Sequence, residues 1–170
     1  MSELASPGQL RAALLRWSLF LAPLLLLLGT TSGLMGGSGA NNAWFMGLEK
    51  PSLYPPPATF GIVWTALYLL MGVALAMVVT ARGARGRGLA IMVFLVQFVL
   101  NLAWSPVFFG MHLLTPALYL LVAIDLAVIV TVVLFWKVRP LAAWLLFPYL
   151  AWVLFATALN WQFVAANVGA

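Results

Sequence analysis

Residues 116–136 read PALYLLVAIDLAVIVTVVLFW and contain one charged side chain, that of Asp125. A helix needs about 20 predominantly apolar residues to cross the hydrocarbon layer of a bilayer, and this stretch is long enough. Four further stretches have the same character, at residues 17–35, 60–80, 89–109 and 141–164. Because all five are continuously apolar, they do not fit the short alternating strands of a membrane barrel. The sequence therefore predicts an all-α, polytopic membrane protein built as a bundle of five transmembrane helices.

The composition of the chain agrees with that fold. Of the 170 residues, 65% are hydrophobic and 6% are charged, whereas a soluble domain is about 45–50% apolar and about 25% charged. The absence of Cys excludes disulfides, thiolate catalysis and Cys-ligated metal sites. One His and three acidic residues leave few side chains for acid–base or metal chemistry. We therefore expect no metal site and no catalytic residues, and an enzyme is the less favoured class.

Basic side chains predict the orientation of the bundle. Seven of the eight Lys and Arg residues fall before the first span or in the connections after the second and fourth spans: Arg11, Arg16, Arg82, Arg85, Arg87, Lys137 and Arg139. The other side carries Lys50 next to Glu49. The positive-inside rule then places the N-terminal segment, residues 1–16, in the cytoplasm and the C-terminus outside, and we expect a bacterial cytoplasmic membrane. Because these juxtamembrane residues account for the net charge of +5, no nucleic-acid partner is expected.

Residues 17–166 are expected to form a single transmembrane domain with a long outer loop at residues 36–59. The start of the chain also resembles a signal peptide, but its apolar stretch continues through Leu34 and Met35, so we expect a retained helix. The loop begins GGSG and contains KPSLYPPP at residues 50–57. Since Pro fixes its own backbone and restricts the preceding residue, we expect a semi-rigid, extended segment rather than a regular helix. A connection of this length is more often functional or disordered than a plain linker.

Aromatic and polar side chains share one face on each of three predicted spans. Helical spacing groups Phe60, Trp64, Tyr68 and Met71 in the second span, Gln97, Asn101, Trp104 and Phe108 in the third, and Tyr149, either Trp152 or Val153, Ala156 and Asn160 in the fifth. Amides that face lipid would be unsatisfied, so these faces should point into the bundle. Such faces are typical of a pocket for a flat hydrophobic ligand. Interhelical hydrogen bonds and interfacial aromatic residues would explain the same pattern, and spacing does not distinguish these alternatives.

Two ionisable residues lie outside these faces. Asp125 stands in the middle of the fourth span, where an ionisable group is costly and is a candidate for function. It is either protonated or hydrogen-bonded to a group such as Thr131 or Asn101, and the sequence leaves these alternatives open. His112 lies in a short outer turn, where a solvated residue is the favoured interpretation over an axial ligand to haem iron.

Several short blocks identify a family. They are KP with PP at residues 50–56, VWT with LY at 63–68, Gln97 followed by NLAWSPVFFG at 101–110, PLAA at 140–143, FPYLAW at 147–152, and FAT with LN at 155–160. In these blocks the chain resembles the TspO/MBR family, the tryptophan-rich sensory proteins and mitochondrial translocator proteins that are also described as peripheral-type benzodiazepine receptors. The resemblance covers most of the chain from about Trp44 to Asn167.

The resemblance implies a homodimeric five-helix bundle that binds porphyrins without a covalent link. Its ligands would be protoporphyrin IX, haem and related flat hydrophobic molecules, held between the helices beneath the first loop. At matching positions the pocket would be lined by Phe60, Trp64, Tyr68, Asn101, Trp104, Phe108, Trp152, Phe155 and Ala156. The implied role is tetrapyrrole sensing, transport or turnover. The alternatives are a small transporter or channel for another hydrophobic solute, and a light-dependent porphyrin-degrading enzyme.

The chain also departs from the family pattern. Ser52, Leu53 and Ala58 stand where the family often carries Trp, so we expect little light-driven breakdown of bound porphyrin. No basic residue follows Arg139, so the sterol-associated pattern near the C-terminus is absent, and the resemblance leaves sterol binding open.

Overall fold

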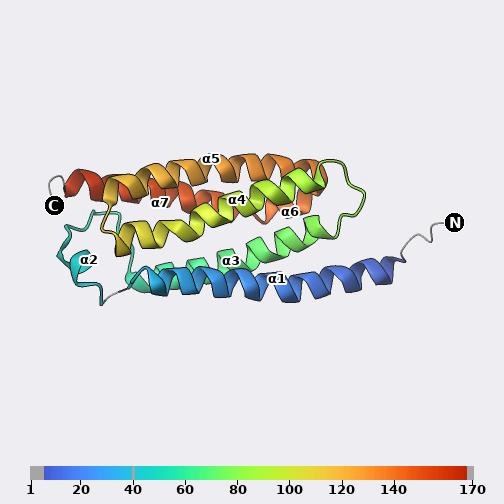
Figure 1. The fold of residues 1–170 in the computed structure, drawn as a ribbon, viewed down its shortest axis with the longest axis horizontal. Helices are drawn as coiled ribbons and strands as arrows, with labels where there is room; N and C mark the ends of the chain where they lie inside the picture. The colour runs from blue at the N-terminus through green and yellow to red at the C-terminus, as the bar shows by residue number, and fades with distance from the viewer. Residues whose placement is uncertain (1–5, 40, 168–170) are drawn as a thin grey trace.

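The computed structural model describes residues 6–39 and 41–167, and in these ranges the chain is helical without strands (Figure 1). Five of its helical segments are long and apolar enough to cross a membrane, which confirms the predicted five-helix bundle. They are α1 (Pro7–Met35), α3 (Pro57–Val79), α4 (Arg87–Ser105) with the π-helix η1 (Pro106–Gly110), α5 (Leu114–Val138), and α6 (Pro140–Trp144) with α7 (Phe147–Ala166). The N-terminal segment proposed at residues 1–16 lies partly outside the described residues.

The long helices form a ring in the order α1, α3, α7, α5 and α4. The broad contacts are α1 along α3, α4 along α5 and α5 along α7. Smaller contacts between α3 and α7 and between α1 and α4 complete the ring, and α3 also meets α4 across it. Figure 1 shows α1 beside α3 in the lower part of the view, with α4, α5 and α7 above them. The interior of the bundle is therefore bounded chiefly by α3, α4 and α7.

Two glycines allow α1 and α3 to approach closely. A Cβ at Gly29 would overlap the Tyr68 ring, and a Cβ at Gly72 would overlap the backbone of Ala22. The four-residue spacing of Gly29, Gly33 and Gly37 in the sequence indicates such an approach, since small residues let helix backbones meet. Of these three, Gly29 makes the contact with α3, whereas Gly37 lies beyond the end of α1 with φ of +73°.

The helices do not end where the apolar runs end. Helix α1 begins at Pro7, well before the predicted start at residue 17, because Ser6 and Gln9 form a capping box ahead of it. The fifth predicted span is not one helix, since it is interrupted between Trp144 and Phe147. Pro148 follows that interruption and has no N–H to continue the hydrogen-bond ladder. The span predicted at 141–164 is thus present as Pro140–Ala166, divided at this point into α6 and α7.

The outer loop contains a short helix, α2 (Ala43–Gly47), which the expectation of an extended segment did not include. The side chain of Asn42 caps its start by accepting a hydrogen bond of 2.9 Å from the backbone N–H of Phe45. The ammonium group of Lys50 donates to the carbonyl oxygens of Phe45 and, at 2.8 Å, of Leu48, near its end. Local caps at both ends thus explain why helix forms between the glycines and the prolines.

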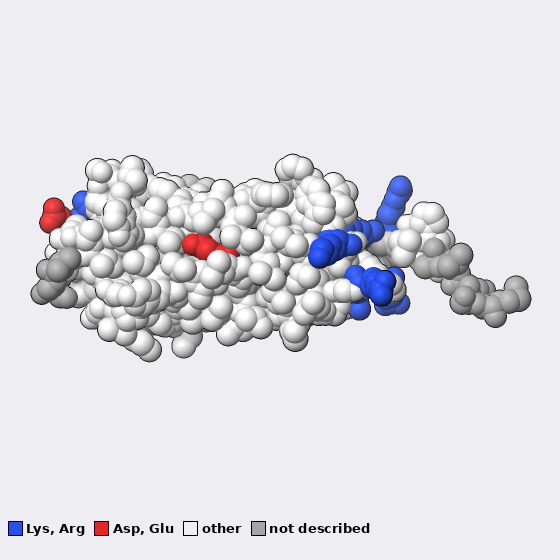
Figure 2. Space-filling view, turned by 90° about the horizontal axis from the view of Figure 1, so that it is seen from above, with Lys and Arg blue, Asp and Glu red and all other residues white. Residues whose placement is uncertain are grey.

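Charged groups are segregated along the body. Figure 2 shows the Lys and Arg side chains gathered mainly at one end, where the α3–α4 and α5–α6 connections lie, with a small acidic and basic pair at the opposite end. Between the two ends the visible surface is uncharged except for one acidic patch midway along it. This is the pattern of a protein whose middle section lies in lipid.

Candidate functional site

The interior face of α3 carries three aromatic residues one turn apart. Phe60, Trp64 and Tyr68 follow at intervals of four residues, and the rings of Trp64 and Tyr68 are stacked with centroids 5.2 Å apart. The Tyr68 hydroxyl donates a hydrogen bond of 3.0 Å to Oδ1 of Asn101 on α4, and both side chains are buried. This bond joins two opposite walls of the interior.

Helix α7 forms the second aromatic wall. Its Trp152 lies 5.8 Å from Phe60, between ring centroids, and 5.3 Å from Phe155. The fully buried Tyr149 packs against Trp64 and donates a hydrogen bond of 2.8 Å to Oε1 of Gln97 on α4. Two tyrosine–amide bonds, one from α3 and one from α7, therefore converge on the same face of α4.

The third wall is the end of α4 together with η1. The rings of Trp104 and Phe108 are stacked with centroids 4.9 Å apart. Phe108 is 2% exposed although it lies in the last turns before the outer surface. The wider turns of a π-helix change the direction of the following side chains, and such segments occur frequently at functional sites. Here η1 turns both Phe108 and Phe109 toward the aromatic rings of the outer loop.

The outer loop closes the interior at this end. The ring of Phe45 lies between 5.1 and 6.1 Å from four others, those of Tyr54, Phe108, Phe109 and Phe163. Tyr54 in turn lies 5.6 Å from Phe60. We call Phe45, Leu48 and Tyr54 the loop plug. Their inward positions were missed in the sequence, because an irregular loop has no periodicity that would show which side chains point inward.

The nine residues expected to line a pocket border this one interior. Phe60, Trp152 and Phe155 form one set of ring contacts, and Trp104 and Phe108 form a second. Phe45 and Tyr54 of the loop plug connect these two sets. Trp64 and Tyr68 belong to a separate set, which Tyr149 joins from α7. Asn101 joins them through its bond to Tyr68, and Ala156 packs against the main core.

Several buried polar atoms on these walls have no hydrogen-bond partner among the described residues. They are Nε1 of Trp104, Nε1 of Trp152, Nε2 of Gln97, and both amide atoms of Asn160. An unsatisfied buried donor or acceptor costs about 1–3 kcal/mol, so each of these atoms calls for a partner. Four of these atoms are nitrogen donors, and two of the four are indole N–H groups on the aromatic walls. Such a set suits a flat apolar ligand that carries oxygen acceptors.

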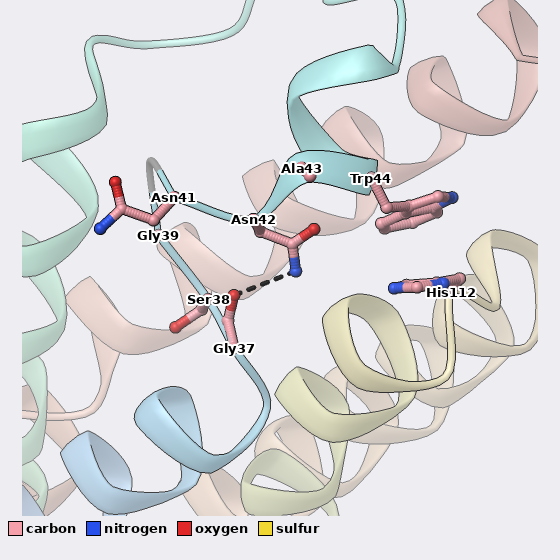
Figure 3. Close-up of a pocket in the computed structure, with 8 residues that line it drawn as sticks. All are labelled: Gly37, Ser38, Gly39, Asn41, Asn42, Ala43, Trp44 and His112. Carbon is pink, nitrogen blue, oxygen red and sulfur yellow. Dashed lines mark hydrogen bonds between the residues drawn. The ribbon is translucent and has the colours of Figure 1, made fainter.

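Two hollows reach the surface. A groove of about 420 Å³ between α3 and α7 has almost wholly apolar walls, formed by Ile62, Val63, Ala66, Leu67, Leu70, Pro148, Ala151 and Trp152. Trp152 thus belongs to both this groove and the interior. At the outer end, a pocket of about 530 Å³ is lined by Gly37, Ser38, Gly39, Asn41, Asn42, Ala43, Trp44 and His112 (Figure 3).

The outer pocket is shaped by a stacked pair of rings. Trp44 lies over His112 with centroids 4.4 Å apart (Figure 3), and His112 is exposed. Asn42 Nδ2 donates a hydrogen bond of 3.1 Å to the carbonyl of Gly37 across the pocket floor. The described residues contain no group of three or more His, Asp or Glu side chains that could hold a metal ion.

Asp125 does not contact the partners considered for it. Thr131 donates to the carbonyl of Ala127, and Asn101 accepts from Tyr68. Instead, Asp125 Oδ2 lies 2.7 Å from the hydroxyl oxygen of Thr157 on α7. The neighbouring hydroxyl is therefore that of Thr157 rather than that of Thr131, because the α5 face that carries Asp125 packs against α7.

Comparisons with known proteins agree with one another. The family model described as TspO/MBR family matches residues 20–165. Protein CrtK of Rhodobacter capsulatus is 35% identical over 141 residues, which cover 81% of this chain and 87% of that protein. The tryptophan-rich sensory protein of Cereibacter sphaeroides is 34% identical over 154 residues, 89% of this chain and 92% of its own. The human translocator protein is 39% identical over 125 residues, 72% and 74% of the two chains.

Proposed function

Because the chain belongs to the TspO/MBR family, we propose that this multi-pass membrane protein binds porphyrins in the interior bounded by α3, α4 and α7. The ligands are protoporphyrin IX or haem and related flat hydrophobic molecules, held without a covalent link. The role is tetrapyrrole sensing, transport or turnover.

The observation that carries this proposal is the pair of unpaired indole N–H groups of Trp104 and Trp152 among the aromatic walls. A porphyrin has a flat apolar ring and two propionate groups. The ring stacks on aromatic faces such as those of Trp64 and Phe108, and the propionates accept hydrogen bonds from buried donors. Entry of so large a ring requires the loop plug to move outward, which makes the outer loop a lid.

A continuous path for a polar solute is the weaker alternative. The polar side chains at membrane depth on α4 are Gln97 and Asn101, and both accept hydrogen bonds from tyrosines. Toward the basic end the interior is filled by Met71, Phe94 and Phe135, all 0% exposed. These apolar side chains favour a binding site closed at one end over a channel through the bundle.

The orientation and assembly belong to the same proposal. The basic end, with the N-terminus, faces the cytoplasm of a bacterial cell, and the C-terminus lies outside. Reporter fusions at Arg85 and after the last residue test this orientation. Activity at Arg85 of a reporter that works only outside the cytoplasm would reverse the assignment.

The assembly proposed from the family resemblance is a homodimer in the bilayer. Light scattering of the detergent-solubilised protein measures this assembly directly.

Titration of the purified protein with protoporphyrin IX, haem and a sterol, followed by quenching of Trp fluorescence, tests the proposed function. We expect saturable quenching by both tetrapyrroles and none by the sterol. Single Trp-to-Phe replacements at Trp104 and Trp152 show whether the responding indoles are those of the interior. Quenching that rises linearly without saturation would mean partition into the detergent and would refute the proposed site.

A further inference from the structure

The contact between α5 and α7 contains an acid that the porphyrin site does not use. Asp125 lies midway along α5 and is 7% exposed. Its Oδ2 is 2.7 Å from the Thr157 hydroxyl oxygen, and that oxygen is also 2.9 Å from the carbonyl oxygen of Val153, one turn earlier on α7. The other carboxyl oxygen, Oδ1, is buried without a partner among the described residues.

Counting protons distinguishes the two ionisation states of this carboxyl. A threonine hydroxyl has one hydrogen, yet here it lies within hydrogen-bond distance of two oxygens. If Asp125 were ionised, its carboxylate and the Val153 carbonyl would compete for that single hydrogen. If Asp125 is protonated, its O–H donates to Thr157 and the Thr157 O–H donates to Val153. Only the protonated acid gives each of the two contacts a hydrogen of its own.

No opposite charge faces Asp125 from the described parts of the helices packed against α5. On α4, Arg87 donates to the carbonyl of Val79 at 2.7 Å, and Arg139, just before α6, donates to that of Met77, so both act at the basic end. Lys137 lies in the last turn of α5. The ionisable group inside α7 is Tyr149, whose hydroxyl donates to Gln97. Element η1 carries no charged residue.

We infer that Asp125 is a proton-binding site within the apolar layer, occupied at neutral pH, whose bound proton ties α5 to Thr157 of α7. An ionised, unpaired carboxylate at this depth is strongly disfavoured in lipid. Figure 2 shows one red patch midway along the body, and the visible surface around it is uncharged. Because Thr157 directly follows Ala156, the proton also helps to hold α7 at the back of the proposed pocket.

The composition of the chain makes this testable without a substitution. Its three acidic residues are Glu3, Glu49 and Asp125, so carbon-13 placed in the aspartate carboxyl during cell-free synthesis marks Asp125 alone. The labelled protein in lipid bilayers at neutral pH is then examined by solid-state NMR and infrared spectroscopy. We expect the carboxyl signal and the isotope-shifted carbonyl band of a protonated acid. A carboxylate signal at neutral pH would overturn the inference.

Two variants test the direction of the hydrogen bond. Thr157→Ser keeps the hydroxyl and should leave the labelled band where it is in the unaltered chain. Thr157→Val removes the acceptor, so the acid carbonyl band should move to the higher frequency of a weakly bonded acid. An unmoved band in folded Thr157→Val would show that Asp125 does not donate to Thr157 and would refute the proposed link. If Thr157→Val does not fold, the labelled spectrum of the unaltered chain still decides the protonation state.

Discussion

The ammonium nitrogen of Lys50 lies 4.4 Å from the centre of the Phe45 ring. The same ammonium donates to the carbonyl oxygens of Phe45 and Leu48, so one side chain binds both the ring and the end of α2. Cation–π contacts of this kind contribute about 0.5–1 kcal/mol at exposed sites. Lys50 therefore fixes the loop plug from its outer side, which gives a physical role to the KP dipeptide noted in the sequence.

Lys50→Met keeps a long side chain but removes the charge and the donors. Since hydrogen bonds to charged groups contribute about 1.5–3 kcal/mol, we expect the loop to open more often while the five long helices stay folded. Chymotrypsin should then cleave near Phe45 and Tyr54 faster than in the unaltered protein. Lys50→Arg, which keeps the charge, is the matched control. Equal cleavage rates in all three proteins would show that Lys50 does not hold the loop.

Trp104→Phe and Trp152→Phe each keep an aromatic ring but remove an N–H donor. If those donors bind the propionates of a porphyrin, each variant should lose about 1–3 kcal/mol, or about five- to 150-fold in affinity. Trp17→Phe is the control, because Trp17 is 39% exposed on α1. Affinity is measured by porphyrin absorbance, which does not depend on the altered indoles. Unchanged affinity in both interior variants would remove the support for the site.

Gly29→Ala places a methyl group where the Tyr68 ring lies. Overpacking of this kind costs about 1–3 kcal/mol, and it should turn Tyr68 away from Asn101. Gly61→Ala on α3 is the control, since no heavy atom lies within 4 Å of the added Cβ there. We expect a lower unfolding temperature in detergent for Gly29→Ala and an equal or slightly higher one for Gly61→Ala. The same unfolding temperature for both would mean that the α1–α3 contact is adaptable.

Burial raises the pKa of Tyr54 above its ordinary value of 10.0. The folded loop therefore holds the phenol proton more tightly than the unfolded chain. The stabilisation that Tyr54 contributes is fully present at pH values below its pKa in the unfolded chain. It is lost as the pH rises through its pKa in the folded protein. We expect the loop plug to loosen above about pH 10. Brief exposure to a protease at each pH measures this loosening as the rate of cleavage in the loop. Tyr54→Phe should remove this part of the pH dependence, and an identical profile in both proteins would contradict the assignment.

Illumination of the porphyrin complex should cause little breakdown of the ligand. The loop positions where the family often carries Trp hold Ser52, Leu53 and Ala58, and none of these can donate an electron to an excited ring. The Soret band of the bound porphyrin should bleach no faster than that of free porphyrin. Protein-dependent bleaching abolished by Trp64→Phe or Trp152→Phe would show that deeper indoles suffice.

The number of spanning helices could be predicted from the sequence, whereas their interruptions could not. Long apolar runs such as residues 116–136 have one stable solution in lipid, because every backbone group must bond within its own segment. The interruption before Pro148 and the short helix α2 depend on local caps and on one missing N–H, which a hydropathy pattern does not record. Apolar composition therefore determines the helix count, and individual residues determine where helices end.

The same division holds for the site. Helical spacing places Trp64 and Tyr68 on one face, and the structure puts that face toward the interior. Phe45 could not be assigned, because it lies in a loop without a period. Nor could Thr157 be matched to Asp125, because their contact depends on the rotation of α7 about its own axis. Contacts within a helix are encoded locally, and contacts between helices require the assembled ring.

The ring order has a consequence for biosynthesis. The wall of the interior that is made first, α3, meets α7, which is made after α4 and α5. Helices inserted one after another from the N-terminus can pair as α1 with α3 and α4 with α5 while the chain is still growing. Before α7 is inserted, the indole of Trp64 contacts lipid at the position where Tyr149 packs in the complete bundle. A nascent chain released before residue 147 would hold the first four membrane helices and an open-sided bundle, so the proposed ligand site is complete only after α7 has been inserted.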